Sequence, residues 1–285
     1  MIVFGGSSSL ELAGEVAMAI GCEFGRVTLK KFPDGERFVK IDSPAEGEDA
    51  IVVQATARPH DENLMELFLI MDALKDQEAE VTAVIPYYGY GRQDKAFEKG
   101  EAVSSKAIAK LLQVSAKRII TINPHKEHIL NYFDVPALAL DASPLIGRYF
   151  KKKRLDSPVV VAPDSGSKDL AQRVADILGC RCESLEKKRL GPGRVVTSAD
   201  KVKLKGDDVV IVDDIIDSGG TIVEAVKALG KKGAGSIRVA CVHAVLTGNA
   251  AERIMGIAEE LVATNTIKTG YSKISVAPLI ASALK

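Results

Sequence analysis

Two adjacent carboxylates and a loop of small residues lie within the stretch Val209–Val226. Asp213 and Asp214 follow four consecutive β-branched residues, 209–212. An apolar run without polar alternation is typical of a strand buried on both faces of a parallel sheet. Small residues follow at 217–221, and apolar residues with helical spacing come next. The stretch therefore predicts a strand, a loop and a helix, with the two carboxylates at the end of the strand.

The predicted loop has the composition of a phosphate site. Gly219 and Gly220 allow the backbone to come close to a ligand. Ser218 and Thr221 add hydroxyl donors at the start of the predicted helix, where an anion is favoured. Carboxylates repel phosphate, so the acidic residues are better suited to accept hydrogen bonds from sugar hydroxyls or to hold Mg²⁺. A phosphorylated sugar fits the whole stretch, although Asp217 or Ser218 acting only as a helix cap remains an alternative.

A third carboxylate, Asp164, follows the predicted strand 158–162. We expect it at the same edge of the sheet as Asp213 and Asp214. Three neighbouring carboxylates need a cation to remain ionised together, so the pattern predicts Mg²⁺.

The segment Glu186–Arg194 is basic and then rich in glycine and proline. A mobile basic loop opposite a phosphate site would close over a transferring phosphoryl group. An exposed hairpin tip is the alternative. We also expect Asp141–Lys153 to connect two domains, with the basic run 151–154 as solvated linker.

The N-terminal half carries further candidate segments. Pro33 and Gly35 predict a turn between two strands, with Phe32 available to stack on a base. Arg92 follows a predicted strand and suits a nucleotide phosphate. His125 also follows a strand and suits a nucleotide or its Mg²⁺, whereas His125 with His128 lacks a third zinc ligand nearby. The glycine and serine residues at 5–9 suit an anion, but a cap from Ser9 explains them as well.

Composition restricts the class of protein. The 285 residues exceed what one core comfortably supports, which predicts two domains, 1–145 and 146–285. Basic and acidic residues balance at 38 each, so a nucleic-acid partner is not expected. The N-terminus has no basic region before its short apolar run, and no apolar run is long enough to span a bilayer. Scattered cysteines predict reduced thiols in a cytoplasmic protein.

Six ordered motifs resemble the ribose-phosphate pyrophosphokinase family over nearly the full length of the chain. They are FPDGE at 32–36, YYGYGRQDK at 87–95, the segment around His125, APDSG at 162–166, KKR at 187–189 and VDDIIDSGGT at 212–221. A phosphoribosyltransferase would normally be shorter and share only the last motif. The resemblance implies an α/β protein with two similar phosphoribosyltransferase-like domains, each a mainly parallel sheet flanked by helices.

The resemblance also implies a reaction and its site residues. The pyrophosphoryl group of ATP would pass to the C1 hydroxyl of ribose 5-phosphate, giving phosphoribosyl pyrophosphate and AMP. Each site is a set of residues expected to act together. ATP would bind at Phe32, Asp34, Gly35, Glu36, Arg92, Gln93 and Asp94; ribose 5-phosphate at Arg189, Asp213, Asp214, Asp217, Ser218, Gly219, Gly220 and Thr221; and Mg²⁺ at His125 and Asp164, with Lys187 and Arg189 stabilising transition-state charge.

The resemblance implies a homo-oligomer, at least a dimer, because Phe32, Asp34 and Glu36 would reach an ATP bound mainly to a neighbouring subunit. Two other functions remain open at this point. A regulatory relative would bind nucleotides without turnover, and a phosphoribosyltransferase would consume the activated sugar.

Overall fold

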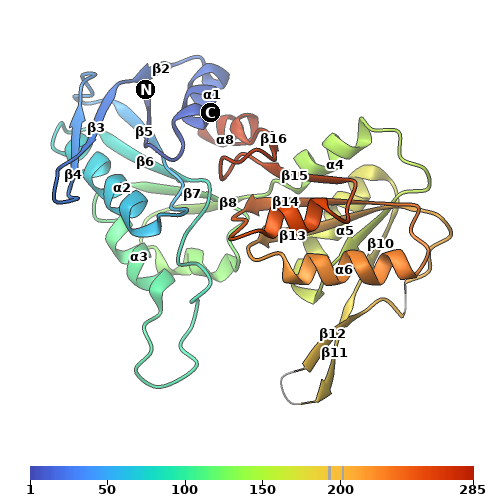
Figure 1. Ribbon diagram of the computed structural model, residues 1–285. Coiled ribbons are helices and arrows are strands. Elements are labelled where there is room, and N and C mark those ends of the chain that lie inside the picture. The colour runs from blue at the N-terminus through green and yellow to red at the C-terminus, as the bar shows by residue number, and fades with distance from the viewer. Residues whose placement is uncertain (192–193, 201) are drawn as a thin grey trace. The chain divides into compact units, whose positions relative to one another are not determined.

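The computed structural model describes residues 1–191, 194–200 and 202–285, with the backbone alone described for 187–191 and 194–197. The chain forms two compact units (Figure 1). The first contains residues 1–141, 266–268 and 275–285, and the second contains residues 142–265 and 269–274. The sequence-based division at 145/146 stays a prediction, but the C-terminal helix α8 (Ala277–Leu284) belongs to the first unit.

The first unit is built on a parallel six-stranded sheet in the order β2-β1-β5-β6-β7-β8. Its strands are β1 (Ile2–Gly5), β2 (Glu23–Gly25), β5 (Asp49–Val53), β6 (Glu80–Ile85), β7 (Arg118–Ile122) and β8 (Ala137–Leu140). The accompanying helices are α1 (Leu10–Ile20), α2 (His60–Lys75), α3 (Ser104–Leu112), the 3-10 helix η1 (Glu127–Tyr132) and α8. A separate antiparallel hairpin pairs β3 (Val27–Lys31) with β4 (Arg37–Ile41).

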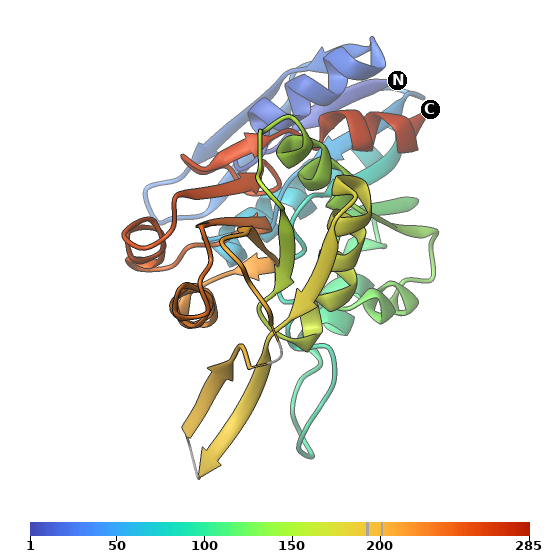
Figure 2. The same ribbon diagram turned by 90° about the vertical axis from the view of Figure 1, so that its right-hand side faces the viewer.

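The second unit repeats this plan, with a parallel sheet in the order β10-β9-β13-β14-β15-β16. Its strands are β9 (Val159–Ala162), β10 (Arg181–Ser184), β13 (Asp208–Ile216), β14 (Ser236–Ala244), β15 (Glu260–Thr264) and β16 (Ser272–Ile274). Its helices are α4 (Ser143–Lys151), η2 (Ser165–Ser167), α5 (Lys168–Leu178), α6 (Gly220–Lys231) and α7 (Ala250–Met255). The hairpin of β11 (Glu186–Gly191) and β12 (Arg194–Ser198) projects from the sheet of this unit (Figure 2).

Continuous apolar runs explain why the central strands are buried. Residues 159–162 and 209–212 are fully enclosed, and the helices α5 and α6 contribute apolar faces to the same unit. Burial on both faces is what a parallel sheet with helical crossovers requires. The predicted α/β class with two parallel sheets is confirmed.

The chain passes from the first unit to the second at 141/142, where the expected connection Asp141–Lys153 begins, but most of that segment is not a linker. Residues 143–151 form α4, which packs against α5 within the second unit. Its apolar residues Ile146 and Phe150 are fully buried, and a Cβ on Gly147 would lie 2.6 Å from the Cβ of Ile177. The basic run that follows is not simply solvated either, since Lys153 pairs with Glu260 at 2.7 Å. Amphipathic spacing and close helix packing therefore prevail over the local density of charge.

Candidate functional site

The loop Asp217–Gly219 joins β13 to α6 at a reversal of strand order in the second sheet. β9 and β13 are neighbours, and the chain proceeds outward from them in opposite directions, to β10 and to β14. In open α/β sheets, ligands bind beside the carboxyl ends of the strands at such a reversal. Both acidic segments meet this condition, because Asp164 follows β9 and residues 217–219 follow β13.

β13 is longer than the sequence indicated. It continues to Ile216, and Asp213 lies opposite Cys241 of β14 instead of beyond the strand end. Pairing with β9 stops at Ile211. Where β13 carries the two carboxylates, it therefore still pairs with β14 but no longer with β9. This arrangement leaves Asp213 and Asp214 on a rigid element beside the end of β9.

Asp213 lies in an electrostatically demanding position. Burial, together with the nearby charges of Asp214 and Asp164, raises the pKa of the Asp213 carboxyl group. Its Oδ1 accepts hydrogen bonds from the hydroxyl of Ser167 and from the backbone N–H of Asp214, the latter at 3.0 Å. Like charges this close favour a cation or hydroxyl donors as ligands. The expectation that Asp164, Asp213 and Asp214 share one cation stays a prediction.

Asp217 is positioned by a residue that sequence reasoning missed. The hydroxyl of Thr247 donates to Asp217 Oδ1 at 2.7 Å, and the backbone N–H of Thr247 donates to the carbonyl of Asp217 at 3.1 Å. Thr247 follows β14, the strand adjacent to β13. Only its place after a parallel strand could have indicated this role. The N-cap position of α6 is taken by Gly219 and not by Asp217 or Ser218.

The two loop glycines have different structural requirements. Gly219 has φ 74°, a left-handed conformation, and a Cβ there would lie 3.2 Å from the Cβ of Ala250 and from Cδ1 of Ile254. A Cβ on Gly220 would meet only the hydroxyl of Ser218, at 4.0 Å. Gly219 is therefore required by the fold of the loop. Gly220 leaves space at the N-terminus of α6, where an anion is favoured.

Asp164 is half-buried at the start of η2. It has an extended conformation, and its Oδ1 accepts a hydrogen bond from the backbone N–H of Gly166 at 2.9 Å. Within the part of the chain that the structure describes, no three His, Cys, Asp or Glu side chains form a group that could hold a metal ion. Mg²⁺ commonly binds one or two carboxylates and completes its shell with water and substrate phosphates. The carboxylates at the ends of β9 and β13 fit that partial donor set.

In the first unit, the predicted turn between two strands is confirmed as the tip of the β3–β4 hairpin. The N–H of Phe32 donates to the carbonyl of Glu36 at 2.8 Å, and Asp34 Oδ1 accepts from the N–H of Glu36 at 3.1 Å. Gly35 has φ 102°, which a side chain would disfavour. The ring of Phe32 is 49% exposed and contacts Phe38 edge to face at 5.9 Å. The tip thus presents an aromatic ring and acidic groups from an ordered turn.

Residues 92–94 lie between β6 and α3, where Arg92 is exposed and Asp94 is buried. The carbonyl of Gln93 accepts a hydrogen bond from the Ser105 hydroxyl at 3.0 Å. Asp94 Oδ2 lies 3.1 Å from His128 Nε2, and its carbonyl accepts from the Tyr132 hydroxyl at 2.7 Å. These contacts anchor the loop that carries Arg92 to α3 and η1. The contact with Asp94 also gives His128 a structural role that needs no metal ion.

His125 is exposed, three residues beyond the end of β7 in the first unit. The preceding Asn123 has φ 35°, and its Nδ2 donates to Asp141 Oδ1 at 3.0 Å, just after β8. This contact ties the ends of neighbouring strands together beside the histidine. The partner Asp164 of the predicted metal pair belongs to the second unit.

The basic segment forms the β11–β12 hairpin, and its tip at 192–193 lies outside the described residues. The backbone of Lys187 pairs with Thr197, and Arg189 pairs with Val195. The side chains of Lys187 and Arg189 lie outside the part of the chain that the structure describes. Their predicted contacts remain predictions.

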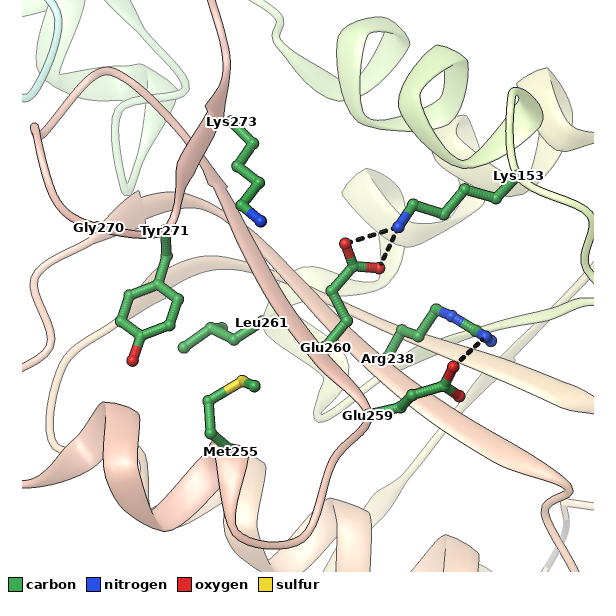
Figure 3. A pocket seen from close by; sticks show the side chains of 9 residues that line it. All are labelled: Lys153, Arg238, Met255, Glu259, Glu260, Leu261, Gly270, Tyr271 and Lys273. Atoms are coloured by element: carbon green, nitrogen blue, oxygen red, sulfur yellow. Dashed lines mark hydrogen bonds and ion pairs between the residues drawn. The ribbon is translucent and has the colours of Figure 1, made fainter.

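A pocket of about 420 Å³ lies at the opposite end of the second sheet, where the sequence indicated no site (Figure 3). Arg238 and Glu260, at the starts of β14 and β15, help to line it. Lys153 binds both oxygens of Glu260 at 2.7 Å, and Arg238 Nη2 binds Glu259 at 2.7 Å. These pairs join the segment after α4 and the loop before β15 to the sheet, which gives the charged groups a structural role.

Comparison with known proteins covers the whole chain. The model described as the N-terminal domain of ribose phosphate pyrophosphokinase matches residues 1–124, and a phosphoribosyl transferase domain model matches residues 128–261. The ribose-phosphate pyrophosphokinase of Methanothermobacter thermautotrophicus is 46% identical, with 100% of both chains covered. That of Methanobrevibacter smithii is 42% identical, also with 100% of both chains covered. The crystal structure of phosphoribosylpyrophosphate synthetase from Mycobacterium smegmatis superposes with a TM-score of 0.87 at 33% identity, covering 99% of this chain and 97% of that chain.

Proposed function

The chain belongs to the ribose-phosphate pyrophosphokinase family, and from this premise we propose that it transfers the pyrophosphoryl group of ATP to the C1 hydroxyl of ribose 5-phosphate. The products are phosphoribosyl pyrophosphate and AMP. The activity is that of a transferase in nucleotide biosynthesis. The observation that carries the proposal is the phosphate-type loop at the strand-order reversal of the second sheet, in a chain similar to these enzymes from end to end.

Ribose 5-phosphate binds at the loop after β13. Its phosphate lies against Gly220 and the N–H groups at the start of α6, with the hydroxyls of Ser218 and Thr221 as further donors. The sugar hydroxyls donate to Asp213 and Asp214. The support is the open space at Gly220 and the fixed carboxylates of β13. Asp217, Gly219 and Arg189 complete this proposed set.

ATP binds through the first unit. Phe32 stacks on the adenine, and the acidic tip of Asp34, Gly35 and Glu36 accepts hydrogen bonds from its amino group. Arg92, Gln93 and Asp94 form the phosphate-facing segment, in which the guanidinium binds phosphate oxygens. The support is an exposed ring on an ordered tip and an exposed arginine on an anchored loop.

His125 and Asp164 hold the Mg²⁺ of the nucleotide in this proposal. The ion would neutralise phosphate charge during transfer. Mg²⁺ binds few protein donors and retains water and substrate phosphates as its other ligands. The remaining task of the protein is to position the substrates and stabilise charge.

Lys187 and Arg189 stabilise the charge of the transition state. Cationic groups of this kind contribute about 10³ to 10⁵ in rate, so Lys187→Ala should lose roughly 4 kcal/mol or more of barrier lowering. We expect substrate affinities and the circular dichroism spectrum to stay near those of the wild type while turnover nearly disappears. Lys188→Ala removes the same charge one residue away and serves as the control. Near-normal turnover of Lys187→Ala would remove this residue from the mechanism.

The activity itself is tested by incubating the pure protein with ATP, Mg²⁺ and ribose 5-phosphate. Formation of AMP with phosphoribosyl pyrophosphate is expected. Nucleotide binding without AMP would favour a regulatory relative, and consumption of phosphoribosyl pyrophosphate with a base would favour a phosphoribosyltransferase.

The proposed enzyme is a cytoplasmic homo-oligomer, at least a dimer, with each ATP site shared between subunits. In the described part of the chain, no helix has the length and apolar character needed to cross a membrane. Sedimentation equilibrium measures the oligomeric state. A monomer with full activity would contradict shared ATP sites.

A further inference from the structure

The loop Gly6–Ser9 follows β1 where strand order reverses in the first sheet, between β1 and β5. Such a position is where open α/β sheets bind ligands. Here two side chains of the chain itself lie against the loop. The N–H of Ser7 donates to Glu66 Oε1 at 2.6 Å, and the Ser8 hydroxyl donates to Gln54 Oε1 at 2.8 Å. The loop that suits an anion therefore binds an internal carboxylate.

Ser9 is the N-cap residue of α1, but its hydroxyl does not make the capping hydrogen bond that the sequence suggested. The Ser9 hydroxyl instead accepts a hydrogen bond from the N–H of Ala55 at 2.8 Å. A Cβ on Gly6 would lie 2.3 Å from Gln54 Oε1. The crevice between the ends of β1 and β5 is thus closed by Gln54 and Glu66.

Glu66 is fully enclosed, at 0% exposure. Oε1 also accepts from Gln54 Nε2 at 2.9 Å, whereas Oε2 accepts no hydrogen bond within the described residues. The charge on Oε2 is compensated by Arg37 Nη1 at 3.2 Å. A buried carboxylate that loses its cation is strongly destabilised, so Glu66 holds Arg37 in place.

Arg37 is the first residue after the hairpin tip 32–36 and lies opposite Lys31 in the β3–β4 register. Its Nη2 also binds Glu62 at 2.8 Å, and Lys31 binds the same carboxylate at 3.1 Å. Glu62 and Lys31 are well exposed, so their pair contributes little. Among these ion pairs between α2 and the base of the tip, the pair of Arg37 and Glu66 is the most enclosed.

We infer that Glu66 is a positioning residue for nucleotide binding, acting through Arg37 to fix the hairpin tip that presents Phe32. The inference rests on the proposed function, in which this tip binds the adenine of ATP. Its consequence is selective: loss of the connection weakens ATP binding and leaves ribose 5-phosphate, which binds in the second unit, unaffected.

The test is isothermal titration calorimetry of the full-length protein with ATP and, separately, with ribose 5-phosphate. Glu66→Gln keeps the shape of the side chain and an oxygen for the Ser7 N–H but removes the charge that holds Arg37. We expect its Kd for ATP to rise about tenfold, equivalent to about 1.4 kcal/mol, with the Kd for ribose 5-phosphate within about twofold of the wild type.

Lys40→Gln is the matched control, because Lys40 pairs with Asp42 at 3.0 Å toward the opposite end of the same hairpin. Its affinity for ATP should equal that of the wild type. If Glu66→Gln does not fold, Arg37→Lys tests the same connection. Lysine keeps the positive charge but lacks the length and the forked geometry of arginine. It too should weaken ATP binding selectively.

Unchanged ATP affinity in the folded variant, or equal losses for both ligands, would overturn the inference. Wild-type turnover is measured in parallel and tests the proposed function separately. If the wild type forms AMP and the variant binds ATP as tightly as the wild type, the role of Glu66 is refuted and the proposed function stands. If the wild type forms no AMP but Glu66→Gln still weakens ATP binding selectively, the proposed function is refuted and the role of Glu66 stands.

Discussion

Replacing Gly219 with alanine tests whether the loop after β13 is built as the structure indicates. Two costs arise in the folded state. The left-handed backbone, with φ 74°, costs an L-residue about 1–2 kcal/mol. The new Cβ would also lie 3.2 Å from Ala250 Cβ and from Ile254 Cδ1. Cδ1 is the end of a flexible side chain, but Ala250 Cβ moves only with α7, so overpacking adds about 1–2 kcal/mol.

The expected loss for Gly219→Ala is therefore about 2–4 kcal/mol of unfolding free energy in the unliganded protein. Gly220→Ala is the matched control, since it adds the same methyl group one residue later, where the nearest contact is 4.0 Å away. Reduced freedom of the unfolded chain should leave this variant equal to the wild type or more stable by up to about 1 kcal/mol.

Urea unfolding followed by circular dichroism gives the midpoints, and the denaturant slopes must agree for the comparison to hold. Because the chain has two units, hydrogen exchange of α6 and β13 amides assigns the affected transition to the second unit. A difference between the two alanine variants below about 0.5 kcal/mol would refute the argument. It would mean that the loop relaxes and that Gly219 is not required by its backbone conformation.

Three further predictions address other parts of the molecule. Thr247→Val removes the hydroxyl that holds Asp217 and should weaken ribose 5-phosphate binding by about 1–2 kcal/mol, measured by calorimetry, whereas Thr247→Ser should retain it. Burial opposes ionisation of Glu260, yet hydrogen bonds from Lys153 and Tyr149 lower its pKa below the ordinary 4.5. The contribution of this carboxylate to the unfolding free energy is therefore present above pH 4.5 and is lost as the pH falls through the lowered pKa. The urea midpoints of Glu260→Gln and the wild type should accordingly differ at pH 7 and converge at acidic pH. A chelator should abolish AMP formation without changing the circular dichroism spectrum, and added Mg²⁺ should restore it; activity in excess chelator would exclude the ion.

The sequence by itself predicted the elements whose cause is local. The buried strand before Asp213, the helix after Gly220 and the hairpin at Phe32 follow from apolar periodicity and from glycine and proline at turns. The family resemblance rested on the same segments, and the full-length comparisons agree with it. Local patterns succeed here because burial on both faces and backbone conformation are properties of consecutive residues.

Tertiary structure decided what lies opposite those segments. Glu66 reaches the loop at Ser7 across 59 positions of sequence, and Thr247 reaches Asp217 across 30. Helix periodicity predicts that Glu66 belongs to α2 but not that it is enclosed against a glycine-serine loop. Likewise, no local signal assigns α8 to the first unit. Parallel sheets bring the ends of distant strands together, so the partners of a site residue depend on strand order, which emerges only when the crossovers pack.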